Sequence, residues 1–303
     1  MLSSGNNFFA SGRQGTRRLK AALFLLPAVV LVVGLFWYAL VFTGYISLTS
    51  WPGIGPIHWI GFGNYTHLYH DPETRTALTN TGYWIGGSLV LPVGLGLLAA
   101  VMLQNLKGQA VFKNIFYLPY AIGLTATGVI WGFLLSGPGG GGVSEAFRAV
   151  GLHGLANTQW LFKPPLNTFS MIVASTWQVM GTDMLLFLVG LGALDRSVFE
   201  AAALDGATGL TLLRKVTLPM LRPMLTVVIT ITIVGSLQAF NVIWILTQGG
   251  PFGSSNTLAT WLYQQGFSQY SMGYASAIAV VLTVLVIVLS SGYLRRSLRL
   301  SED

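Results

Sequence analysis

The sequence predicts an all-α polytopic membrane protein with six transmembrane helices. Only 8% of its 303 residues are charged and 53% are hydrophobic, which leaves too few charges to cover the surface of a soluble domain. Apolar stretches of about 20 residues or more, each long enough to cross a bilayer, recur along the chain. They predict spans at 21–48, 82–104, 112–136, 167–194, 222–247 and 274–294.

The distribution of charge predicts that both termini lie in the cytoplasm. With this orientation, all of the 16 Lys and Arg residues except Arg75, Arg148 and Lys163 fall in cytoplasmic segments. This asymmetry follows the positive-inside rule, so the net charge of +7 reports topology and does not indicate a nucleic-acid partner. We therefore expect a cytoplasmic tail at 1–20, a membrane domain at 21–294 and a second cytoplasmic tail at 295–303.

The sequence contains no catalytic or nucleotide-binding motif. Its glycine run SGPGGGG precedes no Gly-Lys-Ser/Thr, so there is no Walker A loop, and any ATP must be hydrolysed by another subunit. HExxH, GxSxG and clustered carboxylates are also absent, and the chain has no cysteine. We expect neither an enzyme nor a bound cofactor or metal ion.

Small residues and proline inside the spans predict local features of the helix bundle. Gly82 and Gly86, and likewise Gly128 and Gly132, lie four residues apart, a spacing that permits close packing between helices. Pro92 lies in the middle of the second span, where it is expected to kink the helix.

The segment EAAALDGATGLTLLRKVTLPML, within the predicted cytoplasmic loop 195–223, is unusually rich in charge for this chain. SVFEAAAL predicts a helix with Ser197 as its N-cap and Glu200 three residues later. Asp205-Gly206 should end that helix, because glycine readily adopts the left-handed conformation. A second short helix is expected to run up to Pro219. Such a pair of helices suits insertion into a groove on a partner, although an ordinary structured loop is an open alternative.

The same segment resembles the EAA loop of the permease subunits of bacterial ABC importers. The resemblance extends to the carbohydrate branch, similar to maltose, trehalose and glycerol-phosphate permeases, through FKNIFYLPYAI at 112–122 and LTQGGPFGSSNTLATWLYQQGF at 246–267. The sequence departs from the pattern at Leu213, where an aromatic residue is usual. The positions that match the loop motif and would contact the ATPase are Glu200, Ala201, Ala202, Asp205, Gly206, Ala207, Leu218 and Pro219.

The resemblance implies a type I importer permease fold in the bacterial plasma membrane. It further implies a second permease subunit in a heterodimer, two ATPase subunits that bind the EAA loop, and an extracytoplasmic binding protein that delivers a sugar. The same fold importing another solute, such as a glycerol phosphate derivative, is one alternative. A secondary transporter that works alone is another.

Polar and aromatic residues at membrane depth are the candidates for the substrate pathway, because a buried polar group is costly unless it has a partner. In span five, Gln238, Asn241 and Trp244 recur at intervals of three along one helix face. The resemblance places ligand contacts at Phe240 and Asn241. Span four adds Trp177 and Gln178, either of which could instead bond to neighbouring helices.

Asp183 is the only acidic residue at membrane depth in the sequence. A central carboxylate costs about 2.5–3.5 kcal/mol on insertion scales, so something must offset that cost. Asp183 could bind ligand hydroxyls, pair with a group on the partner permease, or be protonated. In the outer segment, Tyr263, Phe267 and Tyr270 are expected either in the interfacial aromatic belt or on a contact surface for a binding protein.

Overall fold

The computed structural model describes the fold of residues 8–302, and the side chains of residues 23–295 apart from Arg196. Within this range the chain is helical, and its only β-pairing is an isolated bridge between Thr49 and Trp59. Five helical spans are long and apolar enough to cross a membrane, and a bent helix pair accounts for a sixth. The long helices are α1 (Phe8–Ile46), α3 (Pro72–Leu103), α8 (Leu166–Gly192), α12 (Arg222–Leu237) and α15 (Met272–Glu302).

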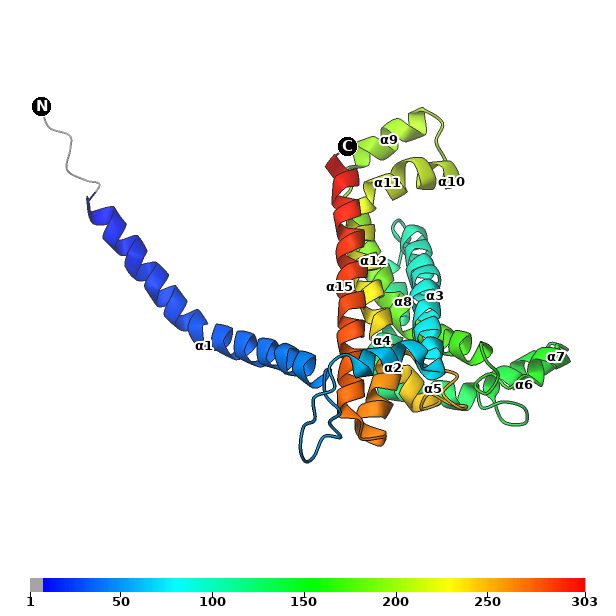
Figure 1. The fold of residues 1–303 in the computed structure, drawn as a ribbon. Helices are drawn as coiled ribbons and strands as arrows, with labels where there is room; N and C mark the ends of the chain where they lie inside the picture. The colour runs from blue at the N-terminus through cyan, green and yellow to red at the C-terminus, as the bar shows by residue number, and fades with distance from the viewer. Residues whose placement is uncertain (1–7, 303) are drawn as a thin grey trace, which may run out of the picture.

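Helices α3 and α8 form the centre of the bundle, with α12 and α15 beside them (Figure 1). Close approach of α3 and α8 depends on glycine. A Cβ at Gly87 would lie 2.9 Å from the side chain of Ile172, and a Cβ at Gly96 would lie 2.8 Å from that of Asp183. The hydrophobic cluster that joins α8 to α12 includes three fully buried residues, Met184, Phe187 and Val228.

Helix α1 extends away from the bundle, and only its C-terminal end lies close to α15 (Figure 1). Every described side chain from Leu23 to Phe42 is exposed. Most of these side chains are apolar, so this helix needs a surrounding of lipid or protein that the rest of the chain does not supply.

The expected third span at 112–136 is formed by two helices that meet at a sharp bend. Helix α4 (Gln109–Ile122) and helix α5 (Leu124–Leu134) meet at 95°. Gly123 joins them with φ +88°, a backbone conformation that side chains other than glycine rarely adopt. The residues on both sides of Gly123 are apolar, so the composition of the sequence gives no sign of the bend.

The predicted fifth span at 222–247 is also interrupted. Helix α12 ends at Leu237, and a short helix, α13 (Asn241–Leu246), follows after Gln238, Ala239 and Phe240. Helix α13 packs against α5, where a Cβ at Gly128 would lie 2.6 Å from Ile245. The predicted packing role therefore holds for Gly128. No atom lies within 4 Å of a Cβ placed at Gly82 or Gly86, so close packing within the described residues does not explain their spacing.

Short helices gather at the end of the bundle opposite the predicted cytoplasmic loop (Figure 1). We call this the outer end. Helix α3 begins there at Pro72, not at residue 82 as expected, because Asp71 caps it by accepting a hydrogen bond from the backbone N–H of Glu73. The short helices at this end are α2 (Gly63–His70), α6 (Gly142–Ala149), α7 (His153–Ala156), α14 (Leu258–Tyr263) and the π-helix η2 (Gln264–Ser268).

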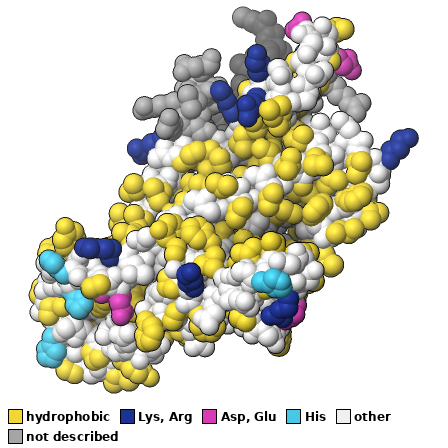
Figure 2. Space-filling model, turned by 90° about the vertical axis from the view of Figure 1, so that its right-hand side faces the viewer, with side chains coloured by type: hydrophobic (Ala, Val, Ile, Leu, Met, Phe, Trp, Pro, Cys, Tyr) yellow, Lys and Arg dark blue, Asp and Glu magenta, His cyan; other side chains and the backbone are white. Residues whose placement is uncertain are grey.

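The other end carries a pair of helical segments that project from the bundle (Figure 1). Hydrophobic side chains cover the face between the two ends, and histidines appear only toward the outer end (Figure 2). The projecting segments are α9 (Arg196–Leu204), α10 (Gly209–Leu212), the π-helix η1 (Leu213–Thr217) and α11 (Leu218–Met220).

Candidate substrate cavity and coupling loop

A cavity of about 320 Å³ lies where the broken helices meet the centre of the bundle. It lies within the size range of small-molecule sites. Helix α3 contributes Trp84 and Ser88, and α8 contributes Ser175, Val179 and Asp183. The remaining wall comes from Leu124 at the start of α5, from α12, and from the break between α12 and α13.

Asp183 is the one acidic residue among the described residues that line this cavity. Its side chain is only 4% exposed, and Oδ2 has no hydrogen-bond partner among the described residues. No lysine, arginine or histidine is among the described residues that line the cavity. Asp183 therefore lines the cavity and carries a buried acceptor oxygen without a hydrogen-bond partner among the described residues.

Trp84 supplies the matching donor. Its indole Nε1 is buried without a hydrogen-bond partner among the described residues, and the ring lines the same cavity. An unsatisfied donor and an unsatisfied acceptor in one cavity indicate a ligand that can both accept and donate hydrogen bonds. Sequence reasoning missed Trp84, because nothing in its spacing separates it from the aromatics that pack in the core.

The break between α12 and α13 brings three of the predicted pathway residues to the cavity. Gln238, Phe240 and Asn241 all line it. They do so because the helix ends at Leu237 and restarts at Asn241, not because they share one face of a continuous helix as expected. The break also exposes backbone polar groups, which a membrane protein tolerates where they line a cavity.

Trp244, the fourth predicted pathway residue of this span, does not line this cavity. It stacks on Phe240 with ring centroids 5.5 Å apart and meets Tyr263 edge-on at 4.7 Å. Tyr263 in turn stacks on Phe267 at 5.0 Å. These four aromatic rings form a continuous cluster toward the outer end and support the wall of the cavity through Phe240.

Trp177 and Gln178 also lie outside the cavity. Trp177 packs edge-on against Trp131, with centroids 6.2 Å apart, and Gln178 is 2% exposed with Oε1 lacking a described partner. The α8 residues that do face the cavity, Ser175, Val179 and Asp183, recur every four positions. Residues 177 and 178 therefore point to other sides of the helix.

Helix α9 begins at a different residue from the one predicted. Asp195, not Ser197, caps α9: its Oδ1 accepts a hydrogen bond from the backbone N–H of Ser197 at 2.9 Å. This hydrogen bond lowers the pKa of Asp195. The cap lies two residues before the predicted one, so the carboxylate accepts from the N–H of Ser197 itself, one of the N–H groups at the start of the helix that have no partner within it.

Helix α9 ends as predicted at Asp205-Gly206. Gly206 has φ +79°, its N–H donates to the carbonyl of Ala203 at 3.1 Å, and the N–H of Ala207 donates to the carbonyl of Ala202 at 2.9 Å. These two bonds form a Schellman motif, which requires the left-handed residue. Pro219 does not end the second helical segment, because α11 continues through it to Met220.

The turn presents an exposed surface to the surroundings. Glu200, Ala201, Asp205 and Gly206 are exposed, whereas Ala202, Ala207, Leu218 and Pro219 are half-buried. Leu204 is 90% exposed and Leu210 is 59% exposed. Apolar side chains at the tip of a charged turn are typical of a surface that docks on another protein.

A membrane-spanning helical bundle with an internal cavity and an exposed turn that projects from one end has the architecture of a transport permease. The chain belongs to the family described as the inner membrane component of binding-protein-dependent transport systems, which matches residues 93–300. It is accordingly a non-catalytic, multi-pass component of the inner membrane that needs no cofactor of its own.

Several relatives are similar over nearly the whole chain. A probable ABC transporter permease protein of Pyrococcus horikoshii is 32% identical over 278 residues, which is 90% of this chain and 93% of that protein. The arabinooligosaccharides transport system permease protein of Bacillus subtilis is 30% identical over 273 residues, 88% of this chain and 85% of that protein.

The fold is also that of a solved structure. A bacterial ABC transporter involved in the import of the acidic polysaccharide alginate contains a chain with TM-score 0.82 and 22% identity. The match covers 96% of this chain and 99% of that chain.

Proposed function

We propose that this chain is a permease subunit of an ATP-driven importer and that it passes a saccharide, delivered by an extracytoplasmic binding protein, through the cavity at Asp183. The single observation that carries this assignment is the pairing of an unused acceptor on Asp183 with an unused donor on Trp84 in one cavity. Sugar hydroxyls both donate and accept hydrogen bonds, so a saccharide satisfies both groups.

The composition of the wall favours a neutral sugar. Gln238 and Asn241 add amide groups, and Phe240 and Trp84 add aromatic faces. No lysine, arginine or histidine among the described lining residues is available to bind a phosphorylated or otherwise anionic solute. Glycerol phosphate derivatives, the alternative cargo, fit this wall poorly for that reason.

We assign the proposed partners to segments of the chain that are exposed and make few contacts with the rest of the protein. The turn around Gly206 is proposed to dock on one of two ATPase subunits, with the whole loop 195–223 passing motion to the bundle. The exposed face of α1 is proposed to lie against lipid and a second, different permease subunit. The tails at 1–20 and 295–303 are proposed to lie in the cytoplasm, so that the outer end faces the binding protein across the bacterial plasma membrane.

The assignment is tested by purifying the tagged chain from native membranes under gentle detergent and identifying the proteins recovered with it. The proposal expects an ATPase and a second permease at near-equal amounts, and their complex should hydrolyse ATP faster when a saccharide-loaded binding protein is added. Recovery of the chain alone, stable and active in transport, would instead favour the stand-alone secondary transporter.

A further inference from the structure

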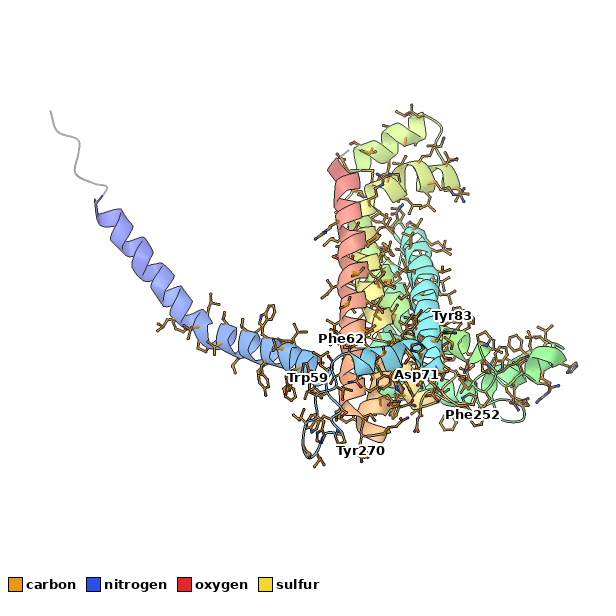
Figure 3. All side chains as sticks on the ribbon, viewed as in Figure 1. Trp59, Phe62, Asp71, Tyr83, Phe252 and Tyr270 are labelled. Carbon is orange, nitrogen blue, oxygen red and sulfur yellow. The ribbon has the colours of Figure 1, made fainter. Side chains whose placement is uncertain are left out.

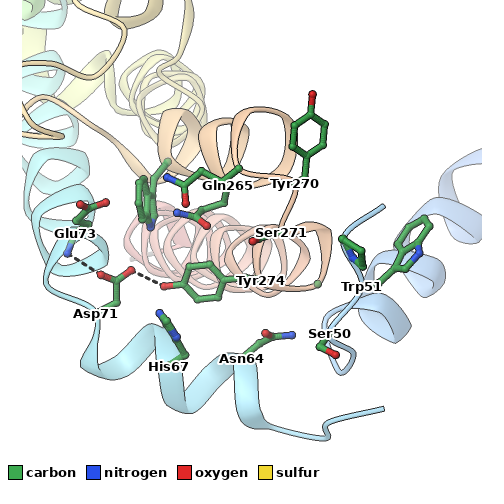
Figure 4. Close-up of a pocket in the computed structure, with 14 residues that line it drawn as sticks. Ser50, Trp51, Asn64, His67, Asp71, Glu73, Gln265, Tyr270, Ser271 and Tyr274 are labelled. Atoms are coloured by element: carbon green, nitrogen blue, oxygen red, sulfur yellow. Dashed lines mark hydrogen bonds between the residues drawn. The ribbon is translucent and has the colours of Figure 1, made fainter. Parts of the chain in front are cut away.

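A second, larger pocket lies at the outer end, away from the substrate cavity. It has a volume of about 720 Å³ and lies between α2, the first turn of α3, the π-helix η2 and the first turn of α15 (Figure 4). We call it the outer pocket. Its polar lining includes Asn64, His67, Asp71, Glu73, Gln265 and Gln269.

The carboxylate of Asp71 is fixed in the wall of this pocket. It accepts hydrogen bonds from the hydroxyl of Tyr274 at 2.6 Å, the hydroxyl of Thr74 at 2.9 Å and the backbone N–H of Glu73 at 3.0 Å. Burial raises the pKa of Asp71, but the hydrogen bonds, led by that from Tyr274, outweigh it and hold the pKa below its usual value. Asp71 is therefore negatively charged at neutral pH.

Two amide side chains in the wall have unused hydrogen-bonding groups. Gln265 is 6% exposed, and its side-chain amide has no hydrogen-bond partner among the described residues. Asn64 is 8% exposed, and its Nδ2 donates to the backbone carbonyls of Ser47 and Thr49, both at 2.8 Å. These bonds fix the orientation of Asn64 and leave its Oδ1 without a described partner. Buried amides without partners indicate a ligand.

The charge of the pocket defines that ligand further. Asp71 and Glu73 are both acidic, and no lysine or arginine is found among the described residues of the wall. The side chain of Glu73 is exposed and has no hydrogen bond or ion pair within the described structure. Fixed acceptors beside two carboxylates suit a cation that donates several hydrogen bonds, as an ammonium or guanidinium group does.

The surroundings of the pocket favour a protein ligand over a free solute. Tyr270 lines the pocket and is 66% exposed, and Trp59, Phe62 and Phe252 on the same end are 60%, 75% and 103% exposed (Figure 3). Exposed aromatic side chains gathered at one end of a molecule are characteristic of protein interfaces, in which arginine and aromatic anchors dominate binding.

We propose that the outer pocket receives a basic side chain, a lysine or an arginine, of the binding protein that docks on this end of the permease. The inference rests on the proposed function, because it assumes that a binding protein docks there. It adds the place and the chemistry of one anchoring contact.

The test uses the whole transporter, assembled with its ATPase and second permease in lipid nanodiscs, and its fluorescently labelled binding protein as the probe. Glu73→Lys reverses a charge in the pocket at an exposed side chain. Glu145→Lys is the control, because Glu145 is an exposed acid on α6 at the same end, where it pairs with Arg148, and it does not line the pocket. We expect Glu73→Lys to weaken docking by about tenfold or more and the control by less than about twofold, with the difference shrinking at high salt.

A second variant distinguishes a specific loss of docking from misfolding. Glu73→Gln should weaken docking by a few-fold while leaving the thermal unfolding temperature unchanged, and a Lys→Glu or Arg→Glu change in the binding protein should restore docking to Glu73→Lys. Unchanged docking by Glu73→Lys, or lower uptake at unchanged docking affinity, would overturn the inference. In either case saccharide import by the wild-type complex keeps the proposed function intact. A wild-type complex that neither recruits a binding protein nor imports saccharide overturns both.

Discussion

Gly96 of α3 and Asp183 of α8 meet so closely that a Cβ on Gly96 would lie 2.8 Å from the Cβ of Asp183. The same Cβ would lie 3.0 Å from the backbone nitrogen of Met184 and 3.1 Å from the carbonyl oxygen of Met180. Two of these three neighbours belong to the backbone of α8, so they cannot move without moving the helix. The glycine therefore determines how deeply the acid is held between the two central helices.

Replacing Gly96 with alanine should force α3 and α8 apart. Overpacking of this kind typically costs about 1–3 kcal/mol in the free energy of unfolding. Thermal unfolding of the purified protein in detergent measures the loss. Gly94→Ala is the control, since nothing lies within 4 Å of a Cβ at that position, and it should leave stability unchanged or slightly raised. Equal stability of the two variants would contradict the close contact.

Replacing Asp183 with leucine should impair saccharide uptake. The change removes the unpartnered acceptor from the cavity, so we expect KM to rise by about tenfold or more, whereas Asp183→Asn keeps one acceptor oxygen and should lose less. Uptake of labelled sugar over a range of concentrations measures both. Gln178→Leu removes another unpartnered acceptor that lies outside the cavity, and it should leave KM near the wild-type value. A similar rise in KM for Gln178→Leu would exclude a specific role for Asp183.

Replacing Gly206 with valine should uncouple transport from ATP hydrolysis. A β-branched residue strains the left-handed conformation at φ +79° and opens the turn that ends α9. We expect loss of uptake with the chain still present in the membrane. Gly206→Asn is the control, because asparagine tolerates this conformation and should keep most of the activity. Normal uptake by the valine variant would count against the coupling role.

Replacing Tyr274 with phenylalanine should destabilise the outer end in a pH-dependent manner. It removes the 2.6 Å hydrogen bond to Asp71, and a bond to a charged acceptor contributes about 1.5–3 kcal/mol. Because the pKa of Asp71 is lowered in the folded protein, its contribution to stability is complete above the unfolded value of about 3.9 and is lost as the pH falls through the folded pKa. The stability difference between variant and wild type should therefore be present at pH 7 and narrow below about pH 4. A constant difference across that range would contradict this origin.

The class of fold and the coupling turn were predictable because their signals are local. Apolar length predicts helices in a bilayer, and Asp205-Gly206 predicts a helix end from backbone preference alone. The breaks at Gly123 and at Gln238–Phe240 were not predictable in this way. The residues on both sides of Gly123 are as apolar as the rest of the span, and polar residues such as Gln238 and Asn241 also occur inside unbroken helices, as Gln178 does in α8. Helix α5 packs against α13, a contact between segments distant in the sequence that local preference does not reveal.

The residues of the candidate site were likewise predictable only where the signal is local. Asp183 is conspicuous in the sequence as an isolated acid in an apolar span. Trp84 is not, because only the folded chain shows that its indole nitrogen lacks a partner. Trp177, Gln178 and Trp244 were assigned to the pathway from polarity and spacing. Their orientation depends on where α8 faces the cavity and on where α12 ends, which the spacing of residues in one helix does not determine.

We propose that this chain provides the saccharide path of an ATP-driven importer. Uptake of labelled saccharide into proteoliposomes that contain the tagged chain together with its co-purified permease and ATPase tests this proposal. We expect uptake that requires both ATP and the loaded binding protein and that falls sharply in the Asp183→Leu complex. Uptake by the chain alone without ATP, or full uptake by the Asp183→Leu complex, would contradict it.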